Sequence, residues 1–151
     1  MKRGSVDSFL ALVACLASTA CVPMTFSNEG ELDFETYRSA RVQVEAPMQD
    51  PSSYLAAELE RSSGFQIVTT KTNDPVDLVL TVTVQVDVEV STEDDGTTDI
   101  DYRGTATFTA TDARGSTVHA GMETDTSEEP SEAAEDVLDE VALRFLSPYR
   151  I

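Results

Sequence analysis

The sequence predicts a two-layer α+β sandwich: a mostly antiparallel sheet of four to five strands with two helices on one face. Two observations predict it. Apolar and polar residues alternate over long runs, which is typical of strands with one buried face. Two other segments repeat apolar residues at helical spacing and form one stripe each. Packing both helices on one side of the sheet buries every apolar surface, in the order β-α-β-β-β-β-α.

The first three elements follow from alternation and from helix boundary signals. Residues 37–45 alternate and predict a strand. Asp50 is a good N-cap ahead of Pro51, so a helix is expected to begin there. We expect this helix to end at Gly64, as glycine often ends helices, and a short strand to follow over 65–69.

A long hairpin is the clearest pattern in the chain. Every second residue from Leu78 to Val90 is apolar, and Asp94-Asp95-Gly96 supplies a turn. The alternation predicts that all of these apolar residues face the core. The returning strand is expected to present six residues to the same core: Ile100, Tyr102, Gly104, Ala106, Phe108 and Ala110.

A fifth strand and a second helix complete the predicted domain. Residues 118–122 alternate, which places Val118, Ala120 and Met122 toward the core and His119 on the open face. The helix is expected to begin near Ser131, to carry one apolar stripe and to end before Pro148.

The N-terminus has the pattern of an export signal. Lys2 and Arg3 precede an apolar run over 9–17, small residues follow, and then Cys21. No apolar run reaches the roughly 18–20 residues that a membrane-spanning helix needs. The expected organisation is a signal peptide over 1–20, a tether over 21–33 and a single domain over 34–151.

The stretch Ala17-Ser18-Thr19-Ala20-Cys21 resembles the lipobox of bacterial lipoproteins. This resemblance implies that the signal is cut before Cys21, which then carries a diacylglycerol on its thiol and an acyl chain on its amine; no other cofactor is expected. Cys15 would leave with the signal. The alternative is that Cys15 and Cys21 are buried or form a disulfide. Val22 after the cysteine implies the outer membrane, with the domain in the periplasm or, alternatively, at the cell surface.

The segment Asp33-Phe34-x-x-Tyr37-Arg38 resembles a motif at the start of the mature chains of an uncharacterised family of outer-membrane lipoproteins. The layout is also distantly similar to the LPS-assembly lipoprotein. These resemblances cover residues 33–147. They imply a non-enzymatic accessory role.

The amino-acid composition limits the classes of partner that we expect the chain to bind. The chain has 151 residues and a formal charge of −18, which argues against nucleic acid and against a polybasic membrane surface. No glycine-rich phosphate loop is present, and no small-molecule substrate is expected. We expect an envelope protein partner, docked on an unpaired sheet edge or on the open face of the hairpin. That face carries Val79, Thr81, Thr83, Thr105, Thr107 and Thr109.

Two other functions stay open. A hydrolase of envelope glycans needs two suitably spaced carboxylates, and the chain has many. None, however, lies in an apolar context expected to raise its pKa. A divalent cation such as calcium is the other alternative, at an acidic turn formed by Glu93, Asp94, Asp95, Asp99 and Asp101. His119 is the only histidine, so no zinc site or catalytic triad is expected around it.

The charge leads to a prediction about salt. Loss of residues 1–20 removes Lys2, Arg3 and Asp7 and leaves a net charge of −19. Self-repulsion on this scale destabilises a compact state, and salt screens it. We expect the Tm of the mature chain to rise by several degrees between dilute buffer and 1 M NaCl, as measured by circular dichroism. An unchanged Tm would contradict this.

Overall fold

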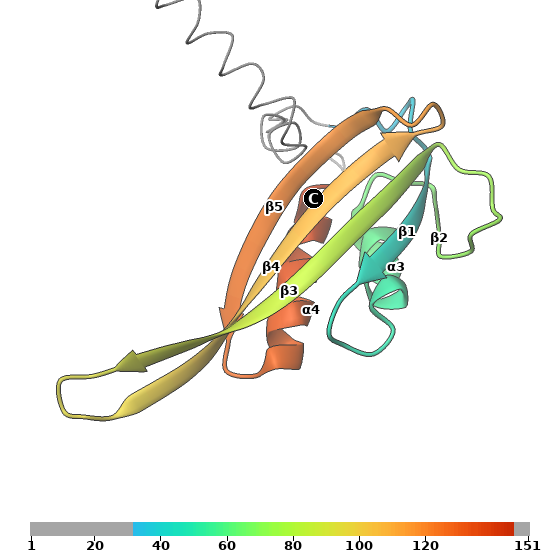
Figure 1. Ribbon diagram of the computed structural model, residues 1–151. Helices are drawn as coiled ribbons and strands as arrows, with labels where there is room; N and C mark the ends of the chain where they lie inside the picture. Colours follow the sequence, from blue (N-terminus) through green and yellow to red (C-terminus); the bar gives the residue numbers. More distant parts are fainter. Residues whose placement is uncertain (1–31, 147–151) are drawn as a thin grey trace, which may run out of the picture.

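The computed structural model describes residues 32–146, which form two helices and a five-stranded sheet; Figure 1 shows their arrangement. The order β-α-β-β-β-β-α and the α+β class agree with the prediction. The elements are β1 (Ser39–Glu45), α3 (Pro51–Ser62), β2 (Ile67–Thr69), β3 (Leu78–Thr92), β4 (Thr98–Asp112), β5 (Thr117–Ser127) and α4 (Pro130–Leu143).

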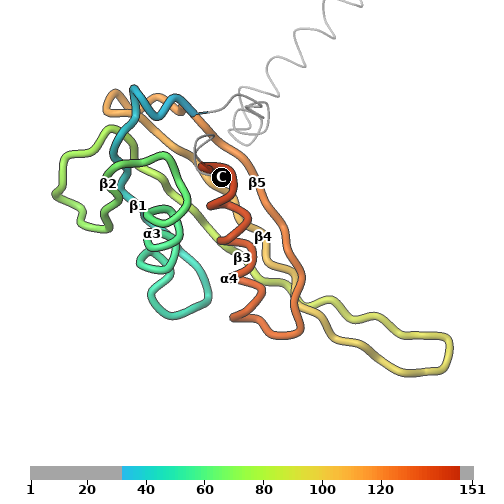
Figure 2. The backbone as a smooth tube through the Cα atoms, turned by 180° about the vertical axis from the view of Figure 1, so that it is seen from behind, coloured from blue at the N-terminus to red at the C-terminus, as the bar shows by residue number. Residues whose placement is uncertain are grey.

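The sheet is mixed, with the strand order β2-β1-β3-β4-β5. Strands β3, β4 and β5 form an antiparallel meander, whereas β1 lies parallel to both β2 and β3. Parallel neighbours require a crossover, and α3 provides the one between β1 and β2. Seen from behind in Figure 2, both helices cover the same side of the sheet. The opposite side is the open face.

The core fills the space between the helices and the sheet. Alternate residues of β3 are buried from Leu78 to Val84, and they face apolar residues of both helices. The largest fully buried side chains include Phe108, Phe145, Leu55, Leu59, Leu138 and Val141. The helical stripes and the near half of the hairpin therefore pack together as predicted.

The start of α3 differs from the predicted N-cap. Asp50 has φ 50° and ψ 55°, and its side chain makes no capping hydrogen bond. Aspartate tolerates this left-handed conformation better than most residues. Ser52 anchors the turn instead: the Val44 N–H donates to its Oγ over 2.9 Å. The helix thus begins at Pro51 as expected, but it is held by the first strand.

Gly64 has a different role from the predicted helix-ending one. Helix α3 ends at Ser62, and the backbone of its capping residue, Ser63, is extended. A Cβ at Gly64 would lie 2.4 Å from the Phe34 ring, so glycine is needed there for close packing. That ring packs edge-on against Phe65, with centroids 5.0 Å apart. This contact joins residue 34 to the core.

Gly104 sets the distance between β4 and α4. A Cβ at this position would lie 2.5 Å from the backbone carbonyl oxygen of Ala133, far inside van der Waals contact. Ala133 itself is fully buried in the first turns of α4. The absence of a side chain at Gly104 therefore allows the helix backbone to lie directly on the strand.

We predict that Gly104→Ala destabilises the domain by about 1–3 kcal/mol, because the helix backbone must move away from the strand. The control is Thr107→Ala, at an exposed position of the same strand. Urea unfolding followed by circular dichroism gives both free energies. Equal stability of the two variants would show that the Gly104 contact does not control packing.

Candidate functional site

The far part of the β3–β4 hairpin extends beyond the two layers, as Figure 1 shows, and we call residues 87–101 the hairpin arm. The β3–β4 register continues without a break to Thr92 opposite Thr98. Pairing of β5 with β4 ends where Ser127 lies opposite Tyr102. The arm is therefore a two-stranded ribbon with no third strand beside it.

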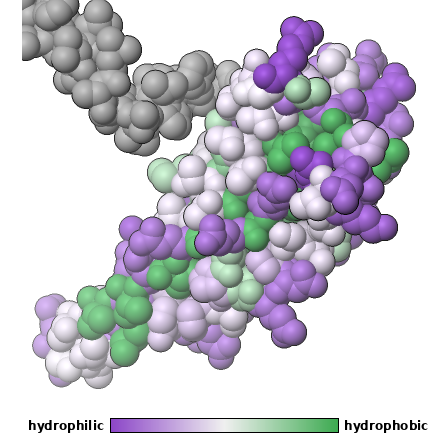
Figure 3. All heavy atoms as spheres, turned by 45° about the vertical axis from the view of Figure 1, so that its right-hand side comes forward, coloured by the Kyte–Doolittle hydropathy of each residue, from purple (hydrophilic) through white to green (hydrophobic). Residues whose placement is uncertain are grey.

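The arm carries an apolar stripe, Val88, Val90 and Ile100, on the side of the sheet that the helices cover elsewhere. Val88 lies opposite Tyr102, and Val90 lies opposite Ile100. The exposed fractions of Val88, Val90 and Ile100 are 60%, 63% and 53%. The prediction that these residues lie in the core is wrong. In the space-filling view of Figure 3, hydrophobic side chains gather on the arm.

The exposure has a simple cause in the lengths of the elements. Strands β3 and β4 have 15 residues each, whereas α4 has 14. Fifteen extended residues span about 50 Å, and fourteen helical residues span about 21 Å. The helix layer ends near Gly104, and the alternation of apolar residues continues past it.

The turn at the tip of the arm is well formed. Gly96 has φ 87°, which favours glycine. The carboxylate of Asp95 accepts hydrogen bonds from the Thr97 hydroxyl over 2.6 Å and the Thr97 N–H over 2.9 Å. These bonds, the hydroxyl bond first, lower the pKa of Asp95. The turn residues thus close the hairpin as predicted.

The acidic turn shows no metal-binding geometry. Among residues 32–146, no group of three or more His, Cys, Asp or Glu side chains is arranged to hold a metal ion. Asp95 is engaged by Thr97. Glu93, Asp94, Asp99 and Asp101 are the other calcium candidates, and calcium binding there stays an untested prediction.

Carboxylates gather at the root of the arm, where β5 ends and α4 begins. Ser127 donates a hydrogen bond to Glu132 over 2.8 Å. Partial burial, followed by the negative charges of Asp125 and Glu132, raises the pKa of Asp136. Three carboxylates thus lie close together on the helix-covered side. The expectation that no carboxylate has a pKa raised by its surroundings is wrong here.

One arginine balances part of the charge near the arm. Arg103 pairs with Glu89 across the strands at 2.9 Å, and both side chains are about half exposed. Exposed pairs of this kind contribute at most about 1 kcal/mol. The pair lies on the open face.

The predicted partner face lies on the uncovered side of the sheet. Thr81, Thr83 and Thr107 are exposed there. Val79, Thr105 and Thr109 are partly buried. Met122 joins this face opposite Thr107, with an exposed fraction of 58%. Docking on this face stays a prediction.

His119 is buried, and its predicted place on the open face is wrong. Its exposed fraction is 4%, and its ring lies 5.5 Å from Phe108 and 5.3 Å from Phe145. Its Nε2 has no hydrogen-bond partner within the described part of the chain. Burial, and then the positive charge of Arg144, lowers its pKa.

A β-bulge explains this error. Ala110 lies opposite His119 and Thr111 lies opposite Thr117, so Val118 is an extra residue in β5. After the bulge, His119 and Gly121 face the core, while Ala120 and Met122 face the other way. The register places Gly121 opposite Phe108, whose ring occupies the space of a side chain there.

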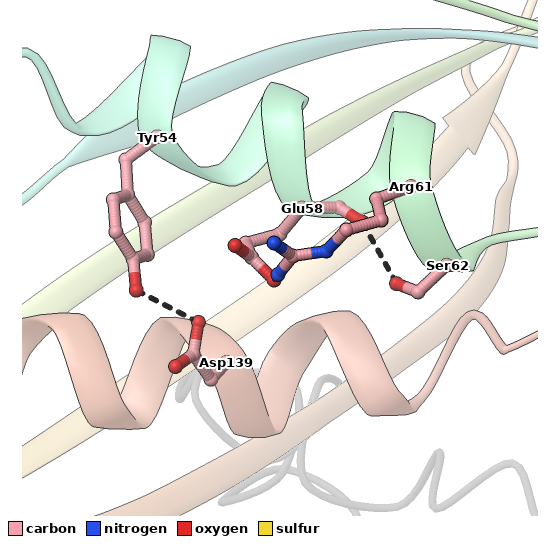
Figure 4. A network of polar contacts seen from close by, with 5 residues as sticks. All are labelled: Tyr54, Glu58, Arg61, Ser62 and Asp139. Carbon is pink, nitrogen blue, oxygen red and sulfur yellow. Dashed lines mark hydrogen bonds and ion pairs between the residues drawn. The ribbon is translucent and has the colours of Figure 1, made fainter.

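A hydrogen bond that the sequence did not reveal links the two helices. Figure 4 shows Tyr54 of α3 pointing toward Asp139 of α4, and its hydroxyl donates over 2.9 Å. Partial burial, and then the bond to Asp139, raises the pKa of Tyr54. Burial also raises the pKa of Asp139, although the Tyr54 bond opposes this. Beside this bond, Arg61 pairs with Glu58 within α3.

A glycan hydrolase needs two carboxylates at one cleft, and two shallow hollows of the domain contain carboxylates. One of about 440 Å³ beside β2 has one carboxylate in its lining, Glu60. The other, of about 260 Å³, has Asp77 and Asp112. Asp77 accepts the N–H groups of Arg38 and Ser39, which lowers its pKa, and Asp112 accepts two backbone N–H groups. Both aspartates stabilise the backbone, and the lowered pKa of Asp77 does not suit a general acid.

The lipid-attachment residue Cys21 lies outside the described residues, as do Cys15, the signal over 1–20 and all of the tether but its last two residues. Within 32–146, neither helix is long and apolar enough to cross a membrane.

No protein-family model matches the chain, and no curated protein matches it. Among solved structures, a hypothetical protein from Chlamydia trachomatis is similar, with 10% identity and a TM-score of 0.50 over 70% of this chain and 93% of that one. At this identity, the similarity shows a shared fold only.

A minor lipoprotein from Acinetobacter baumannii is also similar. Its identity is 18%, and the alignment covers 72% of this chain and 88% of that one, with a TM-score of 0.43. A score under 0.5 does not establish a common fold.

We predict that His119 makes stability depend on pH. Its pKa is lower in the folded state than the ordinary 6.5, so the unfolded state binds more protons below that pH. The stabilisation is complete above pH 6.5 and declines as the pH falls through it. Urea unfolding between pH 8 and 5 should show this loss in the wild type and its absence in His119→Leu. Parallel curves for the two proteins would refute the assignment.

Proposed function

We propose that the chain is a lipid-anchored outer-membrane lipoprotein, facing the periplasm, that acts as a non-enzymatic docking module for an envelope protein. The observation that carries this proposal is the exposed apolar stripe of the hairpin arm. Val88, Val90 and Ile100 form a continuous surface on an element that contributes nothing to the core.

The exposed apolar stripe lowers the stability of the arm unless a partner covers it. A two-stranded ribbon with one apolar face is marginally stable in water by itself. Contiguous exposed apolar surface marks interaction sites in soluble domains. A partner laid over the stripe would remove apolar area from water at about 25 cal/mol per Å² and would stabilise the arm.

Anchoring is supported by the lipobox-like stretch that ends at Cys21. Ten residues, 22–31, separate this cysteine from the first described residue, Leu32, and they reach at most about 35 Å. An acylated Cys21 would thus keep the domain near the membrane, and the arm, at the end of the sheet away from residues 36–37, would point away from the tether (Figure 1). Three acyl chains, each methylene contributing roughly 0.8 kcal/mol, would make the attachment almost permanent.

The charge of the domain favours a protein partner over a phosphorylated lipid. Recognition of phosphate groups normally uses arginine and lysine, and the mature chain would have 8 basic residues against 27 acidic ones. The role of the LPS-assembly lipoprotein is therefore a poorer analogy than that of an accessory module.

The test compares membranes that contain the wild type with membranes that contain Cys21→Ser. A photo-crosslinking residue is placed at Val90, or at Thr81 on the open face as the matched control. We expect acyl mass on wild-type Cys21, membrane release of Cys21→Ser, and one envelope protein crosslinked from position 90. An unmodified Cys21 would refute the anchor, and crosslinks from position 81 alone would move docking to the open face.

A further inference from the structure

We infer that the hairpin arm binds a cationic amphipathic segment of a protein partner, with apolar residues on the stripe and lysines or arginines against the surrounding carboxylates. This inference rests on the proposed docking function and specifies the chemistry of the partner. It combines the exposed stripe with the distribution of charge around it.

All charged residues of the arm are acidic. Residues 87–101 contain seven carboxylates and no Lys, Arg or His. The nearest basic residue along the strand, Arg103, is paired with Glu89. The seven are Asp87, Glu89, Glu93, Asp94, Asp95, Asp99 and Asp101.

These carboxylates influence the binding of a charged molecule to the apolar stripe. They do so although residues alternate between the two faces of the ribbon and several of the carboxylates lie on the other face. The two strands lie about 5 Å apart, so the whole ribbon is narrow. Asp87, Glu89, Asp99 and Asp101 lie on the face opposite to the stripe, and a segment packed about 10 Å from the ribbon stays within about two Debye lengths, roughly 16 Å at physiological salt, of their charges. The stripe is therefore an apolar surface in a strongly negative field.

The root of the arm adds charge on the side of the stripe itself. Asp125, Glu132 and Asp136 lie close together where α4 begins. Glu128 and Glu129 immediately precede the helix and are exposed. A segment that extends from the stripe toward α4 would meet these carboxylates.

The negative charge around the stripe favours some occupants of the stripe over others. A second copy of this chain would bring seven further carboxylates to the same place, and an anionic lipid surface would also be repelled. A polypeptide with alternating apolar and basic residues is attracted by the charge and buries the stripe. Complementarity of this kind determines the choice of partner and speeds association.

The experiment uses the full-length mature chain in a nonionic detergent. The probe is a fluorescent heptapeptide of alternating lysine and valine, and its counterpart has glutamate in place of lysine. Anisotropy titrations at 20 mM and 300 mM NaCl give the Kd. The stripe variant is Val90→Ser/Ile100→Ser. Its control is Ile67→Ser, in which the replaced side chain has an exposed fraction of 63%, equal to that of Val90.

A second pair of variants tests the charge. Asp99→Asn/Asp101→Asn changes the arm, and Glu35→Gln/Glu45→Gln removes two exposed carboxylates elsewhere. We expect the lysine peptide to bind the wild type, with a Kd at least tenfold weaker in the stripe variant and at least threefold weaker in the arm charge variant. Both controls should match the wild type, the glutamate peptide should not bind, and 300 mM NaCl should weaken binding.

Three results would overturn the inference. Equal binding by the wild type and the stripe variant would show general charge attraction. Stripe-dependent binding of phosphatidylglycerol vesicles would make a membrane the occupant. A wild-type dimer in sedimentation that the stripe variant abolishes would make it a second copy. These titrations need neither acylation nor the native partner, so an unmodified Cys21 with stripe-dependent peptide binding would refute only the proposed anchor.

Discussion

The mismatch in length between strands and helices determines how this domain is built. Strands β3 and β4 extend about 50 Å, and α4 covers less than half of that length. Where the helix lies on the sheet, the apolar face of the hairpin becomes core, and Gly104 lets the two backbones meet. Beyond that point the same face is exposed as the stripe of the arm. One alternating pattern thus produces both the core and the candidate docking surface.

The position of the arm gives the proposed function its geometry. The stripe continues the side of the sheet that the helices cover, so a partner segment laid on it would extend the helix layer. Carboxylates lie at the tip and on the opposite face of the arm, and others lie on the side of the stripe at the start of α4. In the proposed function, the stripe provides the binding surface and the charge favours a basic segment as its partner. The opposite face, with its threonines and Met122, is uncovered as well, but no comparable apolar run crosses it.

Local patterns were enough to predict the class, the order of the elements and the helical stripes. They failed where tertiary contacts determine which way a residue faces or whether it is exposed. The bulge at Val118 shifted the alternation of β5, so His119 and Met122 exchanged faces. The extent of the helix layer is a property of packing, so the alternation did not show that Val90 and Ile100 would be exposed. The bond between Tyr54 and Asp139 joins residues 85 positions apart, for which periodicity has no signal.

Hydrogen exchange on the mature chain alone tests the central claim most directly. If the arm is an unsupported ribbon, backbone amides of residues 88–100 should exchange rapidly, while those near Leu80 and Phe108 exchange as slowly as global unfolding permits. Equal protection along both strands would contradict the account, because it would mean that the stripe is already covered within the chain or by a second copy.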